Sequence, residues 1–154
     1  ATSDVPHAGA RADLLAGMAL QAVGDPSAVP LLQATAARLA GLDVPADRLE
    51  CLSVLALALL DGGRPADAVA VAGEVLAELE RSVGPGVVEP GRVLVDVHRV
   101  LLAASDPRVA DVARRAGAYL QERSDAIGDP VLRGGYLSTA VARELRGIAG
   151  TVPG

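Results

Sequence analysis

The stretch from Leu52 to Leu79 contains two strongly apolar segments on either side of the break Gly62-Gly63-Arg64-Pro65. In both segments the apolar residues recur at intervals of three and four positions, which is the spacing of one helix face. Gly62 and Gly63 favour a helix end, because glycine adopts the left-handed C-terminal cap at little cost. Pro65 suits the first turn of a new helix, where its missing N–H had no partner. The stretch therefore predicts a helical hairpin.

Similar breaks occur at three places, Gly24-Asp25-Pro26, Gly63-Arg64-Pro65 and Ser105-Asp106-Pro107, which lie 39 and 42 residues apart. A hairpin of this size cannot bury its own apolar face, so neighbouring hairpins stack and share a core. The sequence therefore predicts an all-α array of about seven antiparallel helices. We expect these helices over residues 8–23, 26–40, 46–61, 65–83, 91–104, 107–127 and 130–148.

We expect one domain over residues 8–150, preceded by a disordered or extended leader at 1–7 and followed by a frayed tail at 151–154. The Gly- and Pro-rich segment from Gly84 to Gly91 is the best candidate hinge. It is too short to argue for two domains.

Composition narrows the classes of function. The chain has 51% apolar residues but neither Phe nor Trp, so its core must be built from Ala, Leu and Val. Its net charge is −5, and it has neither a basic stripe nor stacking aromatics, which argues against direct nucleic-acid binding. The longest apolar run, 54–60, is too short to span a bilayer. The lone Cys51 fits a reducing compartment, so we expect a cytoplasmic protein that does not enter the membrane.

The hairpin pattern resembles the tetratricopeptide repeat (TPR), in which Leu-Gly and Ala recur at fixed positions. The residues that match are Leu52, Leu55-Ala56, Leu59, Ala68 and Ala72 in the central hairpin, Ala16-Gly17, Leu20 and Gly24 in the first, and Val97-His98, Leu101 and Ala110 in the third. The chain departs from the repeat in three ways: every signature aromatic is replaced, Glu80 stands where the closing Pro belongs, and the period exceeds about 34 residues. The resemblance implies a right-handed α-α superhelix.

The C-terminal part, with its Pro-opened Ala/Arg helix and the segment Gly128-Asp129-Pro130-Val131-Leu132-Arg133, is also similar to the helical C-terminal regions of multidomain bacterial signalling ATPases and transcriptional regulators. Such regions hold partners, inducers or neighbouring domains. This resemblance implies a regulatory module of a bacterial signalling protein.

The sequence lacks the combinations of residues that typical catalytic sites use. Because the chain has no Lys, it has no phosphate-loop Lys, no Schiff-base Lys and no Ser-Lys pair. His7 falls in the expected leader, and His98 falls at a helix crossing where a partly buried structural role is favoured. Cys51 would have a lowered pKa at a helix N-terminus, but a packed thiol is the favoured interpretation. We therefore expect no enzyme activity, no cofactor and no metal.

Two groups of charged residues have alternative interpretations. Glu74, Glu78 and Arg81 could include an acid pair, but their spacing is typical of a solvated ion-pairing helix face. Arg114 and Arg115 could meet an acidic partner, but neighbouring residues point about 100° apart on a helix and are more simply two surface arginines.

In tetratricopeptide arrays the first helix of each hairpin lines the concave surface. Transferred to this chain, the resemblance implies a partner-binding groove with an apolar floor and arginines at its edges. Its residues would be Arg11, Leu14, Met18, Gln21, Glu50, Ser53, Leu57, Leu60, Arg92, Val95, Arg99 and Leu102. The groove is either open to a partner or covered by the helix expected at 130–148 or by a neighbouring domain.

These observations favour a non-catalytic protein-interaction or regulatory module. Its partner would be a protein, a peptide or a neighbouring domain of a larger chain, bound by burial of Leu and Met with Arg-carboxylate pairs at the rim. Two alternatives stay open: a small-molecule sensor coupled to an ATPase or DNA-binding domain, and a homodimerisation scaffold.

Overall fold

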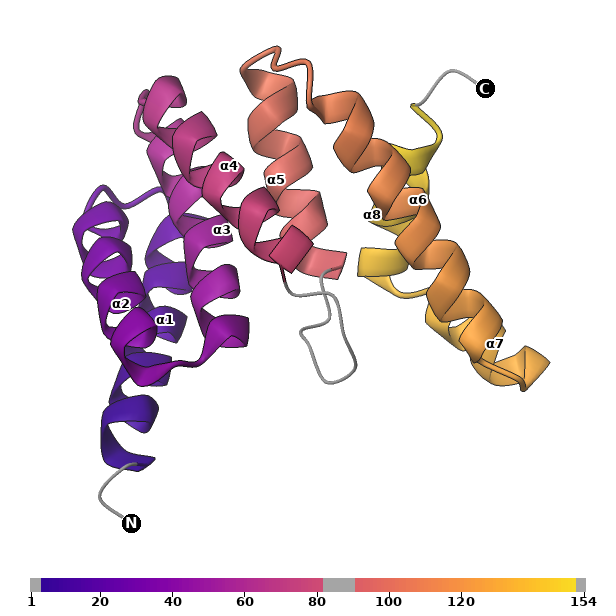
Figure 1. Ribbon diagram of the computed structural model, residues 1–154, viewed down its shortest axis with the longest axis horizontal. Coiled ribbons are helices and arrows are strands. Elements are labelled where there is room, and N and C mark those ends of the chain that lie inside the picture. Colours follow the sequence, from indigo (N-terminus) through magenta and orange to yellow (C-terminus); the bar gives the residue numbers. More distant parts are fainter. Residues whose placement is uncertain (1–3, 82–90, 152–154) are drawn as a thin grey trace. The chain divides into compact units, whose positions relative to one another are not determined.

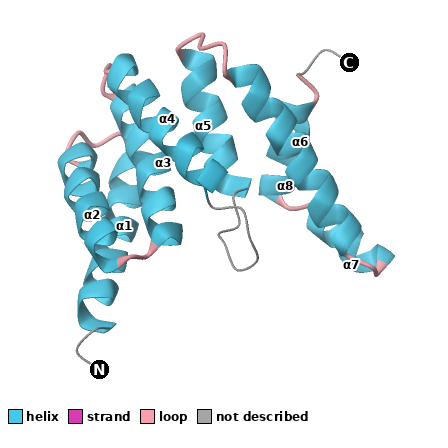
Figure 2. Cartoon of the chain, in the orientation of Figure 1, coloured by secondary structure: helices cyan, strands magenta, loops and turns pink. Residues whose placement is uncertain are grey.

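Eight helices and no strand occur in the residues that the computed structural model describes, 4–81 and 91–151 (Figures 1 and 2). The predicted all-α class is confirmed for these residues. They fall into two compact units, one within Ala1–Val88 and one within Glu89–Gly154, whereas the sequence was interpreted as one domain over 8–150. Apart from Gly91, the candidate hinge Gly84 to Gly91 lies outside the described residues.

Unit 1 consists of four helices, α1 (Asp4–Ala22), α2 (Ala28–Leu42), α3 (Pro45–Asp61) and α4 (Pro65–Arg81). α3 is the central helix, since it contacts α1, α2 and α4, and every residue from 51 to 59 is buried. α1 and α2 approach closely at Gly17, where an added Cβ would lie 2.4 Å from Leu32 Cδ2. The fully buried side chains Leu14, Leu32 and Leu59 form part of the core.

Unit 2 consists of α5 (Gly91–Ala103), α6 (Val109–Ala126), α7 (Pro130–Leu137) and α8 (Ala140–Ala149). α5, α6 and α8 all contact one another, and α7 contacts α6 and α8. Val97, Leu101 and Leu145 are fully buried, whereas no residue of α7 is buried.

The turns after α1, α3 and α5 have the same backbone structure. The second residues after these helices, Gly24, Gly63 and Ser105, have φ of +74°, +74° and +54°. In each turn two N–H groups donate back into the preceding helix in the pattern of a Schellman motif: in the first, Gly24 N–H to Gln21 O and Asp25 N–H to Leu20 O. The corresponding N···O distances in the other two turns agree within 0.1 Å. The three turns predicted from the repeated breaks are therefore structurally equivalent.

Two differences from the expected helices are larger than a shift of two residues at a helix end. α1 begins at Asp4, so residues 4–7 of the expected leader are helical; Pro6 is tolerated there because the first turn of a helix has unpaired N–H groups. The single helix expected at 130–148 is divided into α7 and α8. Thr139 caps α8 by accepting a hydrogen bond from Ala142 N–H, and the pair Gly134-Gly135 weakens the helix before it.

Candidate functional site

The structure buries much of the groove expected on unit 1. Leu14 is completely buried, Ser53 and Leu57 are 1% and 4% exposed, and none of the three can contact a partner without disrupting the core. The prediction that these residues line an open surface is wrong, because α3 is enclosed over residues 51–59 and Leu14 belongs to the core between the helices of unit 1. Met18 and Leu60 remain half-buried.

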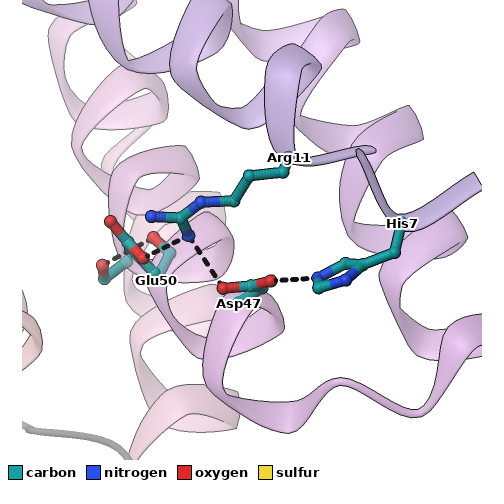
Figure 3. A network of polar contacts seen from close by, with 5 residues as sticks. His7, Arg11, Asp47 and Glu50 are labelled. Atoms are coloured by element: carbon teal, nitrogen blue, oxygen red, sulfur yellow. Dashed lines mark hydrogen bonds and ion pairs between the residues drawn. The ribbon is translucent and has the colours of Figure 1, made fainter. Parts of the chain in front are cut away.

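The polar groove residues of unit 1 bond to one another across α1 and α3. Arg11 Nη1 lies 2.7 Å from Asp47 Oδ1 and 3.1 Å from Glu50 Oε2, and His7 Nε2 lies 2.7 Å from Asp47 Oδ2 (Figure 3). The hydrogen bond that Arg11 donates to Glu50 is the main cause of the raised pKa of Arg11. His7, which was expected in the leader, is therefore part of a network that joins the two helices. Because these groups are partly exposed, each pair contributes at most about 1 kcal/mol to stability.

A cavity of about 520 Å³ lies at the end of unit 1 that carries the turns after α1 and α3. Its polar residues already have partners: Gln21 Nε2 donates to Asp61 Oδ2, Asp25 accepts from Ser27, and Arg64 pairs with Asp67. The cavity is lined by Gln21, Gly24, Asp25, Pro26, Val29, Pro30, Ala58, Asp61, Gly62 and Arg64. No unsatisfied group there points to a ligand.

Unit 2 brings three of the expected groove residues together in a second cavity, of about 430 Å³, between α5 and α8. Its lining residues are Val95, His98, Arg99 and Leu102 from α5, and Glu144, Gly147, Ile148 and Thr151 from α8 and the residues after it. We call this the α5–α8 groove. Leu102 is 59% exposed, Arg99 is exposed and Val95 is buried, so the groove has an apolar floor with an exposed cationic edge.

The fourth expected residue of α5, Arg92, is engaged within unit 2. Its Nη1 lies 3.2 Å from Glu144 Oε2, and its Nε lies 3.5 Å from Asp96 Oδ1. Among the described residues that line the groove, Glu144 is the one that carries a carboxylate. Arg92 therefore offsets the negative charge of Glu144. By contrast, Arg99 has no ion pair within the described part of the chain.

His98 lies in the wall of the α5–α8 groove and is 7% exposed, in accord with the expected burial. Desolvation by burial lowers the pKa of its imidazole, so the ring is neutral at neutral pH. The described residues offer it no hydrogen bond. A neutral imidazole has one N–H donor and one acceptor nitrogen, so this ring keeps hydrogen-bonding capacity that the surrounding helices do not use.

The remaining chemical candidates have structural roles. Burial raises the pKa of the Cys51 thiol to about 12, and its Sγ donates to Leu32 O at 3.3 Å, so it is no nucleophile at neutral pH. Glu78 pairs with Arg81, and Arg114 pairs with Asp111, both on exposed helix faces. No group of His, Cys, Asp and Glu suited to a metal ion occurs among the described residues.

Sequence reasoning missed the α8 half of the groove. Ile148 lies three residues after Leu145 and continues the apolar stripe of the expected last helix, so its face was visible in the pattern. The break at Ser138 and Thr139, which makes α8 a separate helix, was not recognised.

No protein-family model matches the chain, and no significant match was found among curated proteins or solved structures. None of the described helices combines the length and the apolar character that crossing a membrane requires.

Proposed function

We propose that this chain is a non-catalytic, TPR-like interaction module that binds an acidic amphipathic segment of another protein, or of a neighbouring domain, in the α5–α8 groove. The three equivalent turns support a repeat of helical hairpins, each with a left-handed residue at the same place and the same two backbone hydrogen bonds. A preformed helical surface of this kind lets a partner bind with little reordering of the module.

The observation that carries the proposal is the pairing of an apolar groove with arginines that lack an internal partner. Arg99 lines the groove and is exposed, and it has no ion pair within the described residues. Arg143 and Arg146 are exposed on α8 outside the lining of the groove, and they have no ion pair within the described residues either. An arginine binds a carboxylate with two parallel hydrogen bonds, while Leu102 and Ile148 offer apolar area beside it. A segment with alternating acidic and aliphatic side chains satisfies both requirements.

The distribution of charge favours an acidic partner on unit 2. The sequence of unit 1 contains five arginines against eleven Asp and Glu residues, whereas unit 2 contains nine against eight. The acidic excess of the chain therefore resides in unit 1, and an acidic segment is not repelled by the net charge of unit 2.

Selection from a library of random twelve-residue peptides tests the proposal. Peptides retained by the wild-type chain should be enriched in Asp or Glu spaced with aliphatic residues, and Arg99→Glu should abolish that enrichment. Arg114→Glu is the matched control, because it makes the same charge change on an exposed face of α6. If wild type and Arg99→Glu retain the same peptides, the groove is not the binding surface.

A further inference from the structure

We propose that the α5–α8 groove also binds a free small molecule, a carboxylic acid with a short apolar tail, whose carboxylate lies against His98 and Arg99. The inference deepens the proposed function, since the acid would occupy the position of the partner's carboxylate and so regulate partner binding.

His98 is a mostly buried side chain whose polar atoms face the groove. A polar group that is nine-tenths buried usually has a hydrogen-bond partner in the protein or in water. His98 is 7% exposed, borders the cavity and has no hydrogen bond within the described residues. A ligand oxygen in the cavity would accept a hydrogen bond from its N–H in place of water.

Arg99 determines the charge of the ligand that fits the groove. Arg99 follows His98 on α5, lines the same cavity and lacks an ion pair among the described residues. Two donors, one of them permanently cationic, favour an anion over a neutral or cationic group. The neighbouring Glu144 does not cancel this preference, because Arg92 lies 3.2 Å from its carboxylate.

The rest of the cavity is small and mostly apolar. Val95, Leu102 and Ile148 supply apolar surface, while Gly147 leaves space on the α8 side. A cavity of about 430 Å³ is near the lower end of the range for small-molecule sites, which start at about 300 Å³. It suits a molecule with one charged end and a short aliphatic tail, not an extended cofactor.

The two histidines of the chain allow a direct test, because His7 is in unit 1 on Asp47 and serves as an internal control. The imidazole C–H resonances of the full chain are followed by NMR during titration with acetate, butanoate and hexanoate, and with hexanamide as the uncharged match. We expect a saturable shift of His98 with hexanoate at millimolar concentration and no shift of His7. Each added methylene should tighten binding about fourfold, and hexanamide should bind at least about tenfold more weakly.

Variants at exposed positions keep the test independent of folding. Arg99→Gln should weaken hexanoate binding about tenfold or more, Leu102→Ser should remove most of the dependence on tail length, and Arg114→Gln should change neither. The inference is overturned if His98 does not shift, if hexanamide binds as well as hexanoate, or if Arg99→Gln binds like wild type. If acidic peptides bind while free acids leave His98 unchanged, this inference fails and the proposed function stands.

Discussion

Cys51 shows how strongly burial controls the chemistry of a single residue. Its position near the start of α3 suggested that the positive end of the helix dipole would lower the thiol pKa. Instead, desolvation raises the pKa to about 12, because the side chain lies in the core and bonds to Leu32 O. The sequence gives the place of a residue on a helix, but the neighbouring helices decide its solvation.

We predict that Cys51 is unreactive toward thiol reagents in the native chain at neutral pH. Mass spectrometry should detect labelling only at urea concentrations that unfold unit 1, since the reactive thiolate is scarce and enclosed in the folded state. Rapid labelling without urea would contradict the described burial.

Burial also decides which of the expected groove residues can contact a partner. The register taken from the tetratricopeptide resemblance puts Val95, Arg99 and Leu102 in one groove, and all three line the α5–α8 groove. The resemblance could not show that Leu14 and Leu57 are core residues or that Arg11 pairs with Glu50, because these facts depend on contacts between helices.

At the scale of elements, turn chemistry was the most predictable feature. Ser105 has φ of +54° at a position where the equivalent turns have glycine, and a left-handed conformation costs a non-glycine residue about 1–2 kcal/mol. Ser105→Gly should therefore raise the free energy of unfolding by up to about 1 kcal/mol in urea melts. The reverse change in the central turn, Gly63→Ser at φ +74°, should lower it by a similar amount. Loss of stability in Ser105→Gly would show that the turns are not equivalent.

The contact between α1 and α2 gives a second prediction at this scale. A Cβ at Gly17 would lie 2.4 Å from Cδ2 of the fully buried Leu32. Overpacking costs about 1–3 kcal/mol, whereas replacing a helical glycine by alanine gains only about 1 kcal/mol. Gly17→Ala should therefore lower the urea midpoint.

Gly41→Ala is the control for that change, because nothing lies within 4 Å of an added Cβ at this helical position. It should stabilise the chain by about 0.5–1 kcal/mol. Equal stabilisation by both variants would mean that α1 and α2 lie further apart than described.

At the scale of the whole chain, the sequence predicted the helix content and the hairpins but not the two compact units. The repeated breaks are nearly evenly spaced along the chain, so nothing in their period separates the second hairpin from the third. Division into units depends on which helices contact one another, and periodicity shows which face of a helix is apolar without naming the helix that covers it.

The effect of acid on the free energy of unfolding is a property of the chain as a whole. Its direction follows from the groups whose pKa differs between the folded and the unfolded chain. Burial lowers the pKa of folded His98 below the usual 6.5, so the unfolded chain binds more protons once the pH falls below that value. The contribution of His98 to the free energy of unfolding is therefore fully present above pH 6.5. It declines as the pH falls from there toward the folded pKa of His98. Hydrogen bonds from Ser27 and Arg108 lower the pKa values of Asp25 and Asp106, whose contribution is lost only below their usual 3.8. The hydrogen bond from Arg81 likewise lowers the pKa of Glu78, whose contribution is lost below its usual 4.5.

Urea melts over this range should show two separate declines in the free energy of unfolding, one starting near pH 6.5 and one starting below 4.5. His98→Gln should remove the first decline relative to wild type and leave the second, because a glutamine does not titrate. His7→Gln is the matched control, since it changes the other imidazole, on unit 1. If the first decline persists in His98→Gln, the proton uptake belongs to another group, and the buried, neutral state of the imidazole in the α5–α8 groove is wrong.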